Sequence, residues 1–197
     1  MSIIQDGTGK GPSAKVTVKN RLAVDAIAVF AEEEAAHDEN AFIVHSPCHL
    51  SASTAGALLS IKNTSNDYNY HITRIYIDPH KITPTALRVT QVLNPTASVG
   101  SSSTISVVNK NTNSAASLTG TFLGSNATAD LTLTSGDTYH EFGVKTMSSM
   151  ERDMKGTNII GPNKTIAWGF NSTTAATNAE VIGLSINLYR EKLDVHS

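Results

Sequence analysis

Apolar and polar residues alternate with a period of two in four stretches of the chain. These clearest runs are residues 57–62, 130–134, 165–170 and 182–189. Successive side chains of a β-strand point to opposite faces of the sheet, so the pattern predicts strands with one face on a core and one mostly polar face outward. Less regular strands are expected at residues 41–45, 71–78, 86–93, 104–108 and 117–123.

Prolines and polar turn residues separate these runs. Proline lacks the N–H that a strand ladder uses, so five prolines are expected to fall between strands. They are Pro47, Pro79, Pro84, Pro95 and Pro162. Strands that recur at this spacing, without long helices between them, predict a mainly β protein, an antiparallel β-sandwich or jelly roll rather than an α/β fold.

Two short segments favour helix. Residues 31–37 read AEEEAAH, which is rich in helix formers and predicts one or two helical turns, after a strand at residues 21–30. The acidic run at residues 32–34 is expected to be a solvated helix face. Residues 147–155 carry three methionines at helical spacing, which predicts a second short helix that caps the sandwich. A methionine-rich partner surface is the alternative for that segment.

The start of the chain differs from everything after it. Residues 1–12 read MSIIQDGTGKGP, which is too poor in apolar residues to fold alone and too rich in glycine for a stable strand or helix. We therefore expect an N-terminal arm at residues 1–20 and a β-sandwich domain at residues 21–197. The arm is expected to dock on a neighbouring subunit through Ile3, Ile4, Asp6, Gly7, Gly9, Lys10, Gly11 and Lys15.

Composition narrows the possible functions. With 197 residues and 40% hydrophobic residues, the chain can bury one core, and charged residues make up only 16%. The net charge is −2 and no basic patch stands out, so nucleic-acid binding has no electrostatic basis. No apolar stretch reaches the ~18 residues of a transmembrane helix, and no secretory signal pattern is found near the start. We expect neither a nucleic-acid nor a membrane partner.

The glycine-rich stretch from Gly7 to Gly11 invites a phosphate-loop interpretation, which its spacing does not support. A Walker A loop has four residues between its first glycine and a Gly-Lys pair, and then Ser or Thr. Here Gly11 follows Lys10, and Pro12 stands where a dinucleotide-binding loop would have glycine. The segment is better interpreted as a flexible arm, with no cofactor.

Metal binding is also not expected. His45, Cys48 and His49 form the one local cluster of soft ligands, and a structural zinc site needs four. A strand end with a buried cysteine and exposed histidines is the simpler interpretation. Because Cys48 is the single cysteine, an intramolecular disulfide is impossible. Three aspartates near turns are expected to be solvated rather than to bind calcium: Asp6, Asp78 and Asp130.

Catalytic motifs are not found in the sequence. No Gly-x-Ser-x-Gly elbow occurs, and Cys48 and His49, as neighbours on a strand, would point to opposite faces. Trp168 and Phe170 are expected to lie in a core strand. We expect no enzyme and no catalytic residues, with a small hydrolase or metal-dependent enzyme as the alternative from that class.

The arm and the segment after it resemble the N-terminal signature of tailed-bacteriophage virion structural proteins. The resemblance rests on IIQDGTGKG at residues 3–11, SAKV at 13–16 and NRL at 20–22. In that group an Ala/Glu-rich segment and a short strand come next, as they do here. Further similar segments bring the resemblance to most of the chain: residues 58–63, 72–77, 159–168 and 186–190.

The resemblance implies a β-sandwich subunit of the virion, assembled in the host bacterial cytoplasm. It most closely implies a head decoration (cement) protein, expected as a homotrimer whose arm docks on the major capsid protein or another virion protein. The first dozen residues are then expected to become ordered on the particle. A head or tail fibre component that binds a host-surface glycan is the alternative. The resemblance implies no catalytic residues.

Overall fold

The structure is a computed structural model of the 197-residue chain. It describes residues 3–4, 14–16, 22–23, 31–82, 86–99, 105–126, 130–144, 148–177 and 179–193. The chain divides into two compact units, Met1–Phe30 and Ala31–Ser197. The expected boundary after residue 20 stays a prediction, because residues 17–21 and 24–30 lie outside the described residues.

In its described residues the smaller unit contains three short antiparallel strands. They are β1 (Ile3–Ile4), β2 (Ala14–Val16) and β3 (Leu22–Ala23), in the sheet order β1-β2-β3. The strand expected at residues 21–30 is described only at β3.

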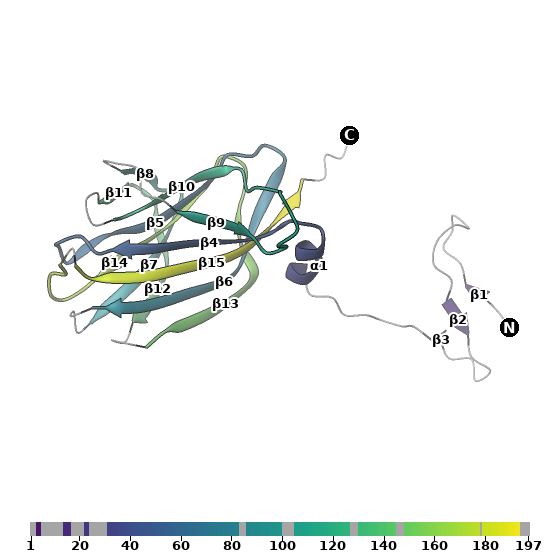
Figure 1. Cartoon of the computed structure of the whole chain (residues 1–197), viewed down its shortest axis with the longest axis horizontal. Helices are drawn as coiled ribbons and strands as arrows, with labels where there is room; N and C mark the ends of the chain where they lie inside the picture. Colours follow the sequence, from purple (N-terminus) through teal and green to yellow (C-terminus); the bar gives the residue numbers. More distant parts are fainter. Residues whose placement is uncertain are drawn as a thin grey trace. The chain divides into compact units, whose positions relative to one another are not determined.

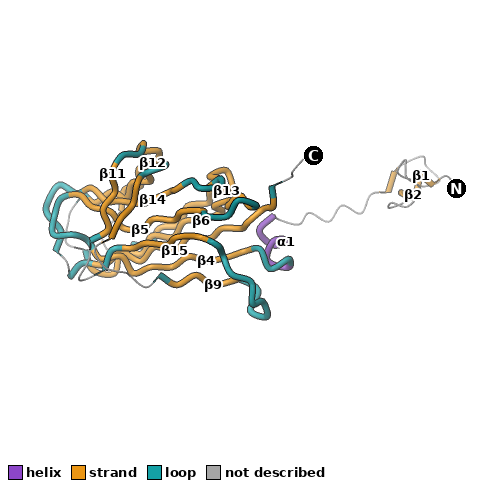
Figure 2. The backbone as a smooth tube through the Cα atoms, turned by 90° about the horizontal axis from the view of Figure 1, so that it is seen from above, coloured by secondary structure: helices purple, strands orange, loops and turns teal. Residues whose placement is uncertain are grey.

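The larger unit is a β-sandwich with one short helix in its described part (Figure 1). Its elements are α1 (Ala31–His37), β4 (Ala41–His49), β5 (Ala55–Asn63), β6 (Tyr68–Lys81), β7 (Leu87–Leu93), β8 (Thr96–Val99), β9 (Ser106–Asn109), β10 (Gly120–Gly124), β11 (Leu131–Thr134), β12 (Asp137–Val144), β13 (Met150–Ile160), β14 (Thr165–Asn171) and β15 (Val181–Lys192). The first sheet has the order β13-β6-β15-β4-β9, and the second has the order β10-β5-β14-β7-β12. Figure 2 shows the sandwich from above.

The strand pairing is that of one long β-hairpin, folded so that its paired strands lie alternately in the two sheets. From the two ends of this hairpin towards its turn, β4 pairs with β15, β5 with β14, β6 with β13 and β7 with β12, all antiparallel. Members of successive pairs alternate between the two sheets. This nested order is a jelly roll. The segment between β7 and β12 adds β9 to the first sheet, β10 to the second and the separate two-stranded ribbon of β8 and β11.

The core lies between the two sheets, and alternation places the large apolar side chains in it. In β14, Trp168 and Phe170 are almost fully buried, as their period-two spacing predicts. In β15, Ile182, Leu184 and Ile186 are fully buried. The predicted antiparallel sandwich is confirmed, and so is the commitment of Trp168 and Phe170 to its core.

Helix α1 confirms the first predicted helix. Its sequence favours helix, and Ala35 is the residue that it buries. The helix ends where Glu39 adopts a φ of 62°, and the N–H of Asn40 donates to the carbonyl oxygen of Ala35 at 2.6 Å. A residue with a left-handed backbone conformation after the last turn commonly ends a helix.

The second predicted helix, at residues 147–155, is wrong. Most of that segment belongs to β13, which pairs with β6. Met150 and Met154 are four residues apart, which places them on one face of a strand as well as on one face of a helix. Both pack against the core. The long-range pairing with β6 therefore outweighs the local helix propensity.

Two of the five prolines also lie inside strands, against expectation. Pro47 belongs to β4 and Pro79 to β6. The pairing of β4 with β9 ends at His45, and the pairing of β6 with β13 ends at Ile77. Each proline therefore lies where its strand has a partner on one side only, and a missing N–H can be tolerated there.

Candidate functional site

The predicted docking residues of the arm are described only in part. Ile3 lies opposite Lys15 and Ile4 opposite Ala14 in the pairing of β1 with β2. Asp6, Gly7, Gly9, Lys10 and Gly11 lie outside the described residues. The backbone pairing places the two isoleucines and Lys15 in one small sheet, which is consistent with a segment that offers strand edges.

An ion pair connects helix α1 to the sandwich, although the glutamate that forms it was expected to be solvated. Glu32 forms an ion pair with Lys110, and their side chains are only 19% and 23% exposed. Partial burial would raise the pKa of Glu32. Hydrogen bonds from Lys110 and Thr73, together with the positive charges of Lys110 and Arg74, outweigh that effect and lower the pKa. Glu33 and Glu34 are exposed, as predicted.

The lowered pKa of Glu32 predicts a pH-dependent stability. The folded chain favours the ionised carboxylate more than the unfolded chain does, so the contribution is complete above the ordinary pKa of 4.5 and is lost as the pH falls through the lowered value. We expect Glu32→Gln to reduce the free energy of unfolding at neutral pH by about 1 kcal/mol. The difference from wild type should shrink on acidification to about pH 3 in urea titrations.

Glu33→Gln is the matched control for that measurement, because Glu33 is an exposed neighbour in the same helix. We expect its stability to follow the wild type at every pH. Equal pH profiles for Glu32→Gln and wild type would show that the ion pair does not hold the helix.

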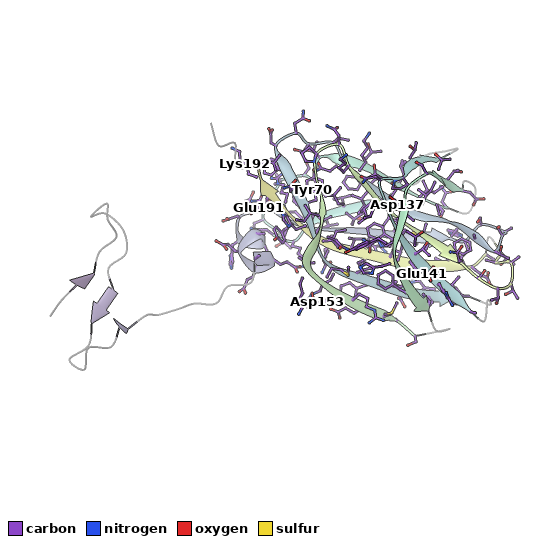
Figure 3. The ribbon with its side chains drawn as sticks, turned by 180° about the vertical axis from the view of Figure 1, so that it is seen from behind. Tyr70, Asp137, Glu141, Asp153, Glu191 and Lys192 are labelled. Carbon is purple, nitrogen blue, oxygen red and sulfur yellow. The ribbon has the colours of Figure 1, made fainter. Side chains whose placement is uncertain are left out.

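One side of the sandwich carries a charged pair of edge strands, β12 and β13 (Figure 1). β12 contains Asp137 and Glu141, and β13 contains four charged residues between positions 151 and 155. Figure 3 labels both β12 acids and also Asp153 on β13. Arg88 and Glu141 form an exposed ion pair at 3.1 Å. Charges on an edge strand oppose its pairing with other strands.

The opposite side carries an uncharged pair of edge strands, β9 and β10. Neither strand contains a charged residue. Val108 on β9 is 53% exposed. An edge without charged residues is open to pairing or packing with another chain. This uncharged edge is therefore the better candidate for a protein contact.

The cluster of His45, Cys48 and His49 does not converge on one point. In β4, Cys48 is fully buried, whereas His45 is exposed, with its Nδ1 2.8 Å from the hydroxyl oxygen of Ser185. Burial raises the pKa of the Cys48 thiol to about 12. The expected buried cysteine is confirmed, and the thiol is not poised to act as a thiolate nucleophile.

The aspartates proposed as solvated turn residues are partly described. Asp78 lies within β6 rather than at a turn, and it accepts a hydrogen bond from the hydroxyl of Ser149 at 2.6 Å, whereas Asp130 is exposed. Asp6 lies outside the described residues. Among the residues that the structure describes, no group of three or more His, Cys, Asp or Glu side chains could hold a metal ion. In the same part of the chain, no helix is both long and apolar enough to cross a membrane.

A polar bridge crosses the core between the sheets, and nothing in the sequence pattern marks it. Gln91 on β7 is fully buried, and its Oε1 accepts a hydrogen bond from Nδ2 of Asn158 on β13 at 3.4 Å. Gln91 lies directly opposite Trp168 on β14. Within the described residues, neither Gln91 Nε2 nor Trp168 Nε1 has a hydrogen-bond partner. This core therefore holds two polar donors at a cost in stability.

Comparisons with protein-family models, with curated proteins and with solved structures gave no match to the chain. The class of the protein rests on its fold, a mainly β chain with two packed antiparallel sheets and, in the described part, one short helix. A narrower assignment stays a proposal.

Proposed function

We propose that the chain is a structural subunit of a tailed-bacteriophage virion, specifically a capsid decoration protein that docks through its N-terminal unit and stabilises the particle. The sequence resemblance and the jelly-roll strand order support this proposal. Jelly rolls occur in viral capsid domains, and also in lectin domains and cupins, so the fold alone does not select the function.

The observation that carries the proposal is the separate N-terminal unit. Residues 1–30 form a compact unit of their own, and their described strands are two or three residues long. Chains below about 40 residues rarely fold stably without a disulfide, a metal or a partner. Cys48, the single cysteine, lies in the other unit, so the first unit cannot form a disulfide of its own. Residues 1–30 contain no histidine, cysteine or glutamate and only two aspartates, Asp6 and Asp25, so a partner protein suits this glycine-rich segment better than a metal does.

Docking of that unit would use strand addition. The backbone of an extended segment pairs with the open edge of a partner sheet, and its side chains enter neighbouring pockets. Ile3 and Ile4 supply apolar side chains, and Lys10 and Lys15 can pair with capsid carboxylates. Because ordering the segment costs conformational entropy, firm attachment requires several subunits that bind together.

The uncharged edge supplies the contact between copies in this proposal. We expect the chain to be a homotrimer in which β9 and β10 face other copies. Val108→Lys places a charge on that edge and should shift the oligomer to monomer, as measured by size-exclusion chromatography with light scattering. Ile159→Lys is the matched control, because Ile159 on the charged edge is 54% exposed and Val108 is 53% exposed. An oligomer that survives Val108→Lys but not Ile159→Lys would place the contact on the charged edge and contradict this expectation.

Gold labelling of the chain on purified virions tests the proposal. A decoration protein gives label over the whole head surface. Label confined to the tail would favour the fibre alternative, and virions without the chain would overturn the proposal.

A further inference from the structure

A groove of about 400 Å³ lies on the outer face of the second sheet, beside β10. The pairing of β5 with β10 and β14 places Lys62 on the same face as Thr121 and Thr165. The segment from Asn94 to Ala97, which leads into β8, lines the groove as well. Figure 1 shows β8 and β10 on the same side of β5. The groove is thus bordered by the ribbon segment and floored by the sheet.

The described lining of the groove carries a positive charge. Lys62 and Lys164 both line it, and among the described residues no carboxylate does. Within the described residues, neither lysine forms an ion pair, whereas Lys110 at α1 pairs with Glu32. Two ammonium groups in one groove of a chain with a net charge of −2 form a local positive site.

The backbone around the groove is fixed by hydrogen bonds. Asn94, with a φ of 51°, donates its N–H to the carbonyl oxygen of Thr165 at 2.8 Å. Lys164 donates its N–H to the carbonyl oxygen of Gly161 at 3.1 Å. The side chain of Asn163 donates to Oδ1 of Asn66 at 3.3 Å. The backbone of such a groove loses little conformational entropy when a ligand binds, so the entropic cost falls mainly on the two lysine side chains.

We propose that this groove binds an acidic oligosaccharide, one whose sugar units carry carboxylate groups. Lys62 and Lys164 pair with the carboxylates. The amide of Asn94 and the hydroxyl of Thr121 both donate and accept hydrogen bonds, which suits sugar hydroxyls. Leu123 offers apolar contact to a sugar ring. The volume lies within the range of small-ligand sites. This activity goes beyond docking on the particle, and its test requires no particle.

The test is calorimetric titration of the full chain with trigalacturonic acid and with its neutral counterpart, galactotriose. We expect the acidic sugar to bind in about the millimolar range, about tenfold more tightly than the neutral sugar, with weaker binding at high salt. The double variant Lys62→Gln, Lys164→Gln should lose at least about tenfold in affinity, because both ion pairs are removed.

The double variant Arg152→Gln, Lys192→Gln is the matched control, because it removes two exposed positive charges from the first sheet. We expect its affinity to equal that of wild type. Equal losses of affinity in both double variants, or equal affinities of wild type for the neutral and the acidic sugar, would overturn the proposed site. Tighter binding of inorganic phosphate or of a hexaglutamate peptide than of trigalacturonic acid would overturn the assignment to a sugar.

Discussion

Deletion of residues 1–12 is expected to abolish attachment of the chain to the phage head while the sandwich stays folded. The deletion removes β1, and with it the partner of β2 and the apolar pair Ile3 and Ile4. The sandwich begins at Ala31 as a unit of its own, and the deletion removes none of its described core residues. We expect affinity for heads to fall by about a hundredfold or more, which corresponds to about 2.8 kcal/mol.

Cosedimentation with heads that lack the chain measures this loss, and circular dichroism checks the fold. A chain with residues 1–12 scrambled is the matched control for charge and length. If docking depends on strand addition by Ile3 and Ile4, the scrambled chain should bind as poorly as the deleted one. Undiminished binding of the deleted chain would assign docking to the sandwich instead.

Trp168→Ala is expected to be the most destabilising single substitution in the core. Trp168 is fully buried between the sheets, and the truncation leaves a large cavity. Such changes cost about 3–5 kcal/mol, out of a total stability of about 5–15 kcal/mol for a typical protein. Urea unfolding followed by far-UV circular dichroism measures the loss, because the variant lacks the chain's single tryptophan.

Trp168→Phe separates packing from hydrogen bonding at the same position. Phenylalanine keeps an aromatic ring in the core and removes the Nε1 donor, which has no partner among the described residues. We therefore expect a loss of only about 1–2 kcal/mol. Equal losses in the two variants would mean that the indole nitrogen is bonded, and a loss below about 1 kcal/mol for Trp168→Ala would contradict the central position of this residue.

Strands could be predicted from the sequence wherever large apolar residues occupy every second position, even where, as in β14 and β15, residues of the other face are buried as well. Residues 165–170 and 182–189 alternate strongly, and both correspond to strands, β14 and β15. The strand β12 was missed because its first five residues are all exposed, so it carries little apolar alternation. The strand β13 was missed because local helix propensity and the methionine spacing both indicated a helix. Only its pairing with β6 makes the segment a strand.

The ion pair of helix α1, the buried glutamine and the uncharged edge all depend on which distant segments meet in the fold, and the sequence alone does not show this. Glu32 was expected to be solvated, but the structure places Lys110 beside it although the two residues are 78 positions apart. Gln91 gives no sign of its buried position, because a glutamine within a strand run usually faces solvent. The uncharged edge could be recognised only once β9 and β10 were known to end their sheets.

A reconstruction of the virion that traces this chain is the most direct test of the proposed role. We expect the chain at every equivalent position of the head surface, with residues 1–12 ordered along the edge of a neighbouring subunit's sheet and β9 and β10 facing other copies. A chain that is attached to the head through the sandwich alone, with no ordered residues before Ala31, would contradict this account.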